Sequence, residues 1–154
     1  MGVLFVSDYF NGNIYKVWPG GLRRTVYWGL IQPAGLAFNG AGDLFVADRA
    51  AGCIYEFTPG GTRSTFASGL SSPVGLAFNS AGVLFEADYA TGVINEFTPD
   101  GTRTTFASGV SGPYGLAFEP VPEPSTLGLL AVAVFGGTFL RWRQRWSIEA
   151  ARSN

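Results

Sequence analysis

The sequence repeats itself every 40 residues, and this periodicity restricts the fold more than any other feature. The motif GLAF begins at residues 35, 75 and 115, and the related motifs LFVSD, LFVAD and LFEAD begin at residues 4, 44 and 84. The second and third units agree at most of their positions. A repeat of this length indicates one small supersecondary unit that is copied along the chain.

Each unit contains four short apolar runs separated by turn residues. In the second unit the runs are 35–38, 44–47, 54–57 and 64–67, and the turns between them include NGAGD and TPGGTR. Glycine, asparagine and proline supply the backbone conformations that tight antiparallel turns need. Four short antiparallel strands in about 40 residues are typical of one blade of a β-propeller. A β-solenoid is the main alternative, although its period is usually shorter.

The sequence therefore predicts an all-β chain, a partial β-propeller of about three four-stranded blades followed by a C-terminal hydrophobic helix. The blades occupy residues 1–119, with units at about 2–41, 42–81 and 82–119. The first unit starts at its second strand, whereas run 115–118 repeats the first strand of a unit. Three blades would leave two open flanks, which leaves three explanations: a missing N-terminal portion, two chains that complete a ring, or an open arc. Residues 1–10 do not resemble a signal peptide, which agrees with the first explanation.

The pattern P-x-G-L-A-F-N-x-x-G-x-L-F-V-A-D-x-x-x-G-x-I-Y-x-F-T-P-x-G resembles the NHL repeat across residues 2–119. The resemblance implies the fold of six-bladed propellers. It does not specify the activity, because such propellers include lactonases, lyases and binding scaffolds.

The C-terminal region has a different character. An uncharged run at 127–140 follows a proline-rich linker at 120–126 and precedes the sequence RWRQRW. We expect an anchor helix at 127–146 and a tail at 147–154. The anchor-end residues, placed on the cytoplasmic side of a membrane by the usual arginine and tryptophan preferences, are Arg141, Trp142, Arg143, Arg145 and Trp146. The run is short for a bilayer, so a buried or surface helix is the alternative.

The order V-P-E-P-S-T, apolar run and arginine cluster resembles the PEP-CTERM sorting signal, with Pro122, Glu123 and Pro124 as its tripeptide. The resemblance implies export from a Gram-negative bacterium and processing by an exosortase. The protein would be an inner-membrane-anchored precursor and then extracellular or on the cell surface. Such proteins are associated with bacteria that make extracellular polysaccharide. The alternative is a proline-rich linker before an incidental hydrophobic end.

Charge and composition exclude several functions for the propeller region. Residues 1–124 carry six Lys/Arg and ten Asp/Glu, a balance of −4, which argues against a nucleic-acid partner. The chain has no histidine and a single cysteine, so it lacks the usual general base and an internal disulfide. We assign no catalytic residue, no metal ligand and no cofactor.

Four acidic positions need an interpretation. Asp8, Asp48 and Asp88 recur at the ends of the second strands. They would form either a metal-binding ring or turn caps that bind backbone N–H groups, and we favour the caps because they recur in every unit. Glu86 stands where the other units have valine. It is either an inward, functionally special carboxylate or a harmless edge substitution, and we favour the second interpretation.

Residues that vary while the scaffold repeats are better candidates for binding. Tyr9, Arg49 and Tyr89 follow the repeated aspartates, and Tyr114 follows a repeated proline. Both loop sets are expected on one rim of the propeller, where these side chains would stack on sugar rings or contact a peptide. Packing is the alternative role.

These observations favour an exported binding or scaffold module with a polysaccharide or protein ligand, and with a second copy of the chain as a partner that completes the propeller. The alternatives are a lactonase-type or lyase-type enzyme whose catalytic blades are missing from this sequence, or a truncated gene remnant.

Overall fold

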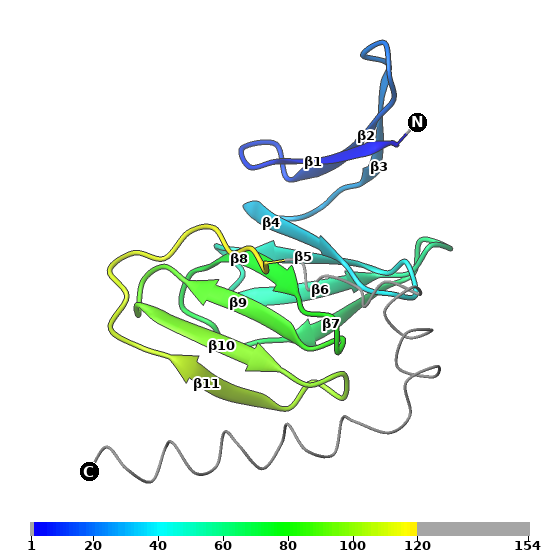
Figure 1. Cartoon of the computed structure of the whole chain (residues 1–154). Coiled ribbons are helices and arrows are strands. Elements are labelled where there is room, and N and C mark those ends of the chain that lie inside the picture. The colour runs from blue at the N-terminus through cyan, green and yellow to red at the C-terminus, as the bar shows by residue number, and fades with distance from the viewer. Residues whose placement is uncertain (1, 120–154) are drawn as a thin grey trace, which may run out of the picture. The chain divides into compact units, whose positions relative to one another are not determined.

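The computed structural model describes residues 2–119, and this part of the chain contains eleven β-strands and no helix. The strands form three antiparallel sheets (Figure 1). The first contains β1 (Leu4–Asp8), β2 (Asn13–Val17) and β3 (Arg23–Tyr27). The second contains β4 (Pro33–Phe38), β5 (Leu44–Asp48), β6 (Cys53–Phe57) and β7 (Arg63–Ala67), and the third contains β8 (Pro73–Phe78), β9 (Leu84–Asp88), β10 (Val93–Phe97) and β11 (Arg103–Ala107). The prediction of an all-β fold built from antiparallel blades is confirmed.

The first sheet differs from the expected four-stranded blade. It has three strands, and the expected strand at 115–118 is not a strand in the structure. The equivalent strands β4 and β8 each pair with the strand that follows them, and the described part of the chain offers no such strand after residue 118. The sheets also run in a different phase from the repeat units, because β4 and β8 begin their sheets at Pro33 and Pro73.

Apolar faces of neighbouring sheets pack against each other. Phe45 and Ala47 of β5 form one cluster with Leu84 of β9 and Phe97 of β10, all of them buried. The opposite face of β5, with Leu44 and Val46, packs with residues of the first sheet in a second cluster. Each large side chain buried in this way contributes about 1.5–3 kcal/mol. The sheets therefore stack as consecutive propeller blades do.

An edge-to-face phenylalanine pair joins β5 to β8, and an equivalent pair joins β9 to the segment 115–118. Phe45 and Phe78 have ring centres 5.0 Å apart, and the Phe85–Phe118 pair lies at 4.9 Å. Phe118 thus packs on Phe85 of the third sheet as Phe78 packs on Phe45 of the second sheet. β4 and β8, the first strands of the second and third sheets, are called the innermost strands below. The segment 115–118 packs as an innermost strand does, although it is not paired as one.

Gly52 shows why the same turn sequence recurs in each repeat unit. Gly52 has a φ of 62°, and a Cβ there would lie 2.5 Å from the carbonyl oxygen of Leu70. Its own carbonyl accepts a hydrogen bond from the Leu70 N–H at 3.0 Å. Only glycine combines this backbone conformation with this close approach. The contact fixes the loop that leads from β7 toward the rim described below.

Two faces of the described part remain open. Phe106, on the third sheet, is 62% exposed, although the equivalent Phe66 packs against the next sheet. Leu4, on the first sheet, is 63% exposed, although the equivalent Leu44 is buried. Within residues 2–119 no helix is long and apolar enough to cross a bilayer. The predicted helix at 127–146 lies outside the described residues.

Candidate functional site

Residues that follow the repeated aspartates each contact the loop that enters an innermost strand. The Tyr9 hydroxyl donates a hydrogen bond to Gln32 Oε1 at 2.9 Å. Arg49 Nε donates one to Ser72 Oγ at 2.7 Å. Both pairs are separated by 23 residues, so the repeat itself places these side chains at one level of the structure.

Contacts also join the rim residues of neighbouring sheets. Arg49 Nη1 donates a hydrogen bond to the Tyr9 hydroxyl at 3.3 Å, and its guanidinium carbon lies 5.1 Å from the centre of the Tyr89 ring. The Tyr89 and Tyr114 rings meet edge to face with centres 6.3 Å apart. The structure therefore brings the four rim residues of the sequence analysis into one continuous row.

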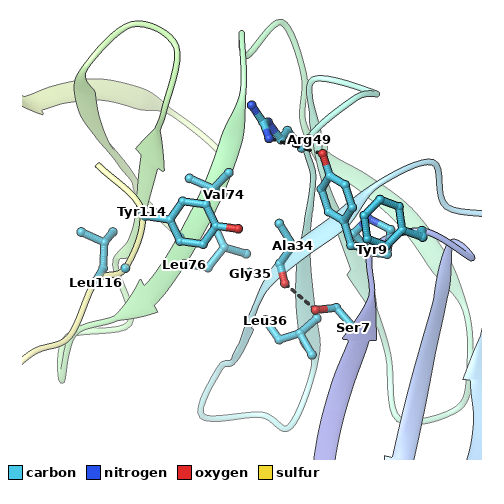
Figure 2. A pocket seen from close by; sticks show the side chains of 14 residues that line it. Ser7, Tyr9, Ala34, Gly35, Leu36, Arg49, Val74, Leu76, Tyr114 and Leu116 are labelled. Atoms are coloured by element: carbon cyan, nitrogen blue, oxygen red, sulfur yellow. Dashed lines mark hydrogen bonds between the residues drawn. The ribbon is translucent and has the colours of Figure 1, made fainter. Parts of the chain in front are cut away.

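A cavity of about 760 Å³ lies beside this row. Figure 2 shows Tyr114 and Arg49 on opposite sides of its mouth, with the innermost strands between them. The walls are apolar and come from the innermost strands and the segment after residue 113. They are formed by Ala34, Leu36, Val74, Leu76 and Leu116. Among the described residues that line the cavity, Arg49 is the only one with a charged side chain.

Two glycines in the innermost strands allow the cavity to have this shape. A Cβ on Gly35 would lie 2.1 Å from the Val74 carbonyl oxygen, and one on Gly75 would lie 2.4 Å from the Tyr114 carbonyl oxygen. No side chain fits at such distances, so adjacent inner segments approach closely only at glycine. This approach positions Tyr114 beside β8.

Gln32 and Ser72, which support the rim, were not identified from the sequence. A signal was present, because position 32 and its repeats at 72 and 112 change as freely as the rim residues that they contact. In the third sheet a Cβ on Gly112 would lie 3.2 Å from the ring of Tyr89. Two positions that lie 23 residues apart and change together from unit to unit indicate that their side chains are in contact.

The repeated aspartates bind backbone N–H groups. Asp48 accepts hydrogen bonds from the N–H groups of Ile31 at 2.8 Å, Gln32 at 2.9 Å and Ala51 at 3.3 Å. It thereby ties the loop before β4 to the turn after β5. Asp8 is bonded mainly to the side chain and N–H of Asn11, and these bonds lower its pKa.

Asp88 repeats the arrangement of Asp48 in the third sheet. It accepts hydrogen bonds from the N–H groups of Ser71 at 2.7 Å and Thr91 at 3.2 Å. Burial opposes ionisation of Asp88, but these backbone hydrogen bonds outweigh it and lower the pKa. The residues of the described part include no group of three His, Cys, Asp or Glu side chains that could hold a metal ion.

Glu86 is not an edge substitution, and the interpretation favoured from the sequence is wrong. It lies on β9, which has β8 and β10 on its two sides, and it is fully buried. Its side chain is on the same face of the sheet as Leu84, which packs against the second sheet. Burial raises its pKa to about 7, and the hydrogen bond from Asn95 is the largest effect that opposes this rise. Glu86 does not line the cavity.

Residues 120–145 match a family described as the PEP-CTERM protein-sorting motif. They carry a PEP-CTERM sorting motif. The match confirms the predicted sorting signal, and Pro122, Glu123 and Pro124 lie within the matched range. It indicates an exported, envelope-targeted protein that an exosortase recognises and processes and whose tail associates with the membrane. These residues, and the anchor-end arginines and tryptophans, lie outside the described part of the structure.

Solved structures similar to the propeller region support its fold. Virginiamycin B lyase from Staphylococcus aureus aligns with a TM-score of 0.64 and 18% identity, covering 74% of this chain and 41% of that one. The nidogen/laminin complex contains a chain that aligns with a TM-score of 0.68 and 25% identity, covering 76% and 48%. Regucalcin from Agrobacterium tumefaciens aligns with a TM-score of 0.59 and 16% identity, covering 67% and 39%.

The chain therefore spans less than half the length of these propeller structures. No curated protein matches the sequence. The likeness establishes a β-propeller type of fold for the described part, as the sequence predicted, and its function has to be argued from its own residues.

Proposed function

We propose that the chain is an exported binding module whose ligand docks on the row of rim residues above the cavity. The observation that supports this most directly is the continuous contact from Tyr9 through Arg49 and Tyr89 to Tyr114. Tyr114 is 62% exposed and Tyr89 44% exposed, so both rings are accessible to a ligand. Exposed aromatic rings beside a cation are suited to binding sugar rings or peptide side chains.

The rim residues are also held in place before any ligand arrives. Arg49 is fixed by Ser72 and Tyr9, and Tyr9 is fixed by Gln32. A side chain that is already immobilised loses less conformational entropy on binding. The alternative of a lactonase-type or lyase-type enzyme is supported only by the fold, and a fold does not determine an activity.

Affinity electrophoresis of the full chain, purified in mild detergent, tests the proposal. Gels would contain dextran, galactomannan or polygalacturonate as probes. We expect one of them to retard the wild type and the Tyr114→Ala variant to lose that retardation. Trp28→Ala is the matched control, because Trp28 is 71% exposed but does not line the cavity. Equal migration of the wild type and Tyr114→Ala in all three gels would contradict the proposal.

The tail acts, in this proposal, as a temporary anchor at residues 127–146, with Arg141, Arg143 and Arg145 on the cytoplasmic side. The proposal rests on the sorting motif and on the arginine preference for that side. Carbonate extraction of membranes from cells that express the chain behind a signal peptide would test it. The full chain should stay in the pellet, and a chain without residues 120–154 should be released.

A second copy of the chain also fits as a partner. Asp48 and Asp88 each bind the loop before an innermost strand, whereas Asp8 has no such loop in the described part. The segment 111–118 occupies the same positions of the repeat as the loop and first strand of the other sheets, and it meets no such aspartate in the described part. Segment 111–118 of one copy would therefore complete the first sheet of another. Light scattering of the full chain in detergent should give a dimer mass, and a monomer mass would contradict the pairing.

A further inference from the structure

Of the cavity-lining residues within 2–119, Arg49 alone has a charged side chain. Its partners in the described part of the chain are the Ser72 hydroxyl, the Tyr9 hydroxyl and the ring of Tyr89. No carboxylate is among them. The positive charge of Arg49 is therefore stabilised by two hydroxyl groups and an aromatic ring, and no negatively charged group of the described part neutralises it.

These contacts fix the guanidinium without using all of its N–H groups. Arg49 donates through Nε to Ser72 and through Nη1 to Tyr9. No hydrogen bond from Nη2 to residues 2–119 accompanies them. An arginine with a planar fork of N–H donors binds a carboxylate in two places at once. Arg49 therefore keeps N–H donors that an acceptor on a ligand can use.

Most of the residues that line the cavity beside this cation are apolar or aromatic. Tyr114 lies across the cavity mouth from Arg49 in Figure 2, and Val74 and Leu76 form the wall between them. Phe10 is 90% exposed and also lines the cavity. One anionic group and a ring with an apolar C–H face would complement Arg49 and these aromatic and apolar side chains.

We infer that the cavity binds a uronic-acid unit of an acidic polysaccharide, with its carboxylate on Arg49 and its ring against Tyr114. The inference rests on the proposed binding function and adds the charge and class of the ligand. A uronic acid carries the carboxylate and the flat C–H face in one rigid unit. An acidic peptide supplies the charge on a flexible chain and has no such face, so the structure favours the sugar.

The overall charge of the propeller region makes the inference specific. Six Lys/Arg against ten Asp/Glu in residues 1–124 repel a polyanion in general. Binding would therefore depend on Arg49 itself, and it would not be the diffuse attraction that a basic surface gives.

Isothermal titration of the full chain in detergent with two matched probes tests the inference. The probes are a trigalacturonate and its fully methyl-esterified form, which has the same rings without the charges. We expect the acid to bind about tenfold tighter than the ester, because hydrogen bonds between ionised groups are stronger than neutral ones. Arg49→Gln should remove this difference, and Arg49→Lys should keep part of it.

The control variant is Arg63→Gln. Arg63 stacks on Tyr55 at 3.9 Å and does not line the cavity, so its loss should leave the preference unchanged. Equal binding of both probes, unchanged in Arg49→Gln, would overturn the inference and leave the proposed function standing. Absence of binding by either probe would overturn it as well. Tighter binding of a hexaglutamate peptide than of trigalacturonate would also overturn it, in favour of a peptide ligand.

Discussion

Glu86 Oε2 accepts a hydrogen bond of 2.8 Å from Asn95 Nδ2 in the interior of the third sheet. The two residues face each other across β9 and β10, and the equivalent pairs in the other sheets are Val6 with Tyr15 and Val46 with Tyr55. The other carboxylate oxygen of Glu86 is buried and has no partner in the described residues. One blade therefore replaces an apolar contact by a polar pair that is only partly satisfied.

Stability should fall as the pH rises from about 4.5 to about 7. Burial raises the pKa of Glu86 from 4.5 to about 7, with smaller opposed effects from Asp88, which raises it, and Arg103, which lowers it. The unfolded chain ionises Glu86 near pH 4.5, so the stabilising contribution of the protonated form is complete below that pH and is lost as the pH approaches 7. The shift corresponds to at most about 3 kcal/mol.

Urea unfolding followed by circular dichroism between pH 5 and pH 8 measures this loss. Glu86→Gln keeps an oxygen for Asn95 and does not titrate, so its stability should change much less over the same range. A wild-type profile that coincides with that of Glu86→Gln would show that Glu86 is not the titrating group.

Restoring the residues of the other blades should stabilise the third one. Glu86→Val alone leaves the buried Asn95 amide without its partner, and the cost of such a group is about 1–3 kcal/mol. Adding Asn95→Tyr rebuilds the pair found at Val46 and Tyr55. Arg103 is present to cover the new ring as Arg63 covers Tyr55, and both arginines donate to a loop carbonyl of the preceding sheet.

A double-mutant cycle in urea at pH 8 tests this coupling. The double variant should be more stable than the wild type, and the two changes should be favourably coupled by at least about 1 kcal/mol. Strictly additive effects would mean that the two positions do not act as a pair.

The sequence predicts the sheets well because their strands recur with the repeat and their turns contain the required glycines. It also predicts the rim, since Tyr9, Arg49 and Tyr89 occupy one position of the unit. Two features depended on three-dimensional context. Segment 115–118 has the composition of a strand but forms none, because pairing needs a neighbour that composition does not supply. The burial of Glu86 does not follow from the sequence, because alternation along β9 does not tell which face a neighbouring sheet covers.

Close approach of the innermost strands should make Gly35 irreplaceable. In Gly35→Ala the new Cβ would lie 2.1 Å from the Val74 carbonyl oxygen, so β4 and β8 would have to separate. We expect a loss of about 1–3 kcal/mol, as for other overpacked sites. Gly40→Ala is the control, because a Cβ there meets nothing within 4 Å. Thermal unfolding of both variants should show a lower Tm only for Gly35→Ala, and equal Tm values would refute the close approach.

Asp48 should contribute far more to stability than Asp8, although the two residues occupy the same position of the repeat. Asp48 is fully buried and satisfies the N–H groups of Ile31, Gln32 and Ala51. Asp48→Ala would leave these groups without their acceptor, and a single unsatisfied buried donor already costs about 1–3 kcal/mol. Asp8 binds Asn11 and the hydroxyl of Tyr15 and ties down no incoming loop in the described part.

Asp8→Ala should therefore cause a much smaller loss than Asp48→Ala when both variants are compared by urea unfolding at pH 7. The loop before β4 also carries Gln32, which supports Tyr9, so Asp48→Ala should weaken ligand binding at the rim as well. If a second copy supplies segment 111–118 to Asp8, the difference between the variants should narrow as the protein concentration rises, because the dimer then gives Asp8 the same backbone partners. A difference that is independent of concentration would argue that Asp8 has no such partner.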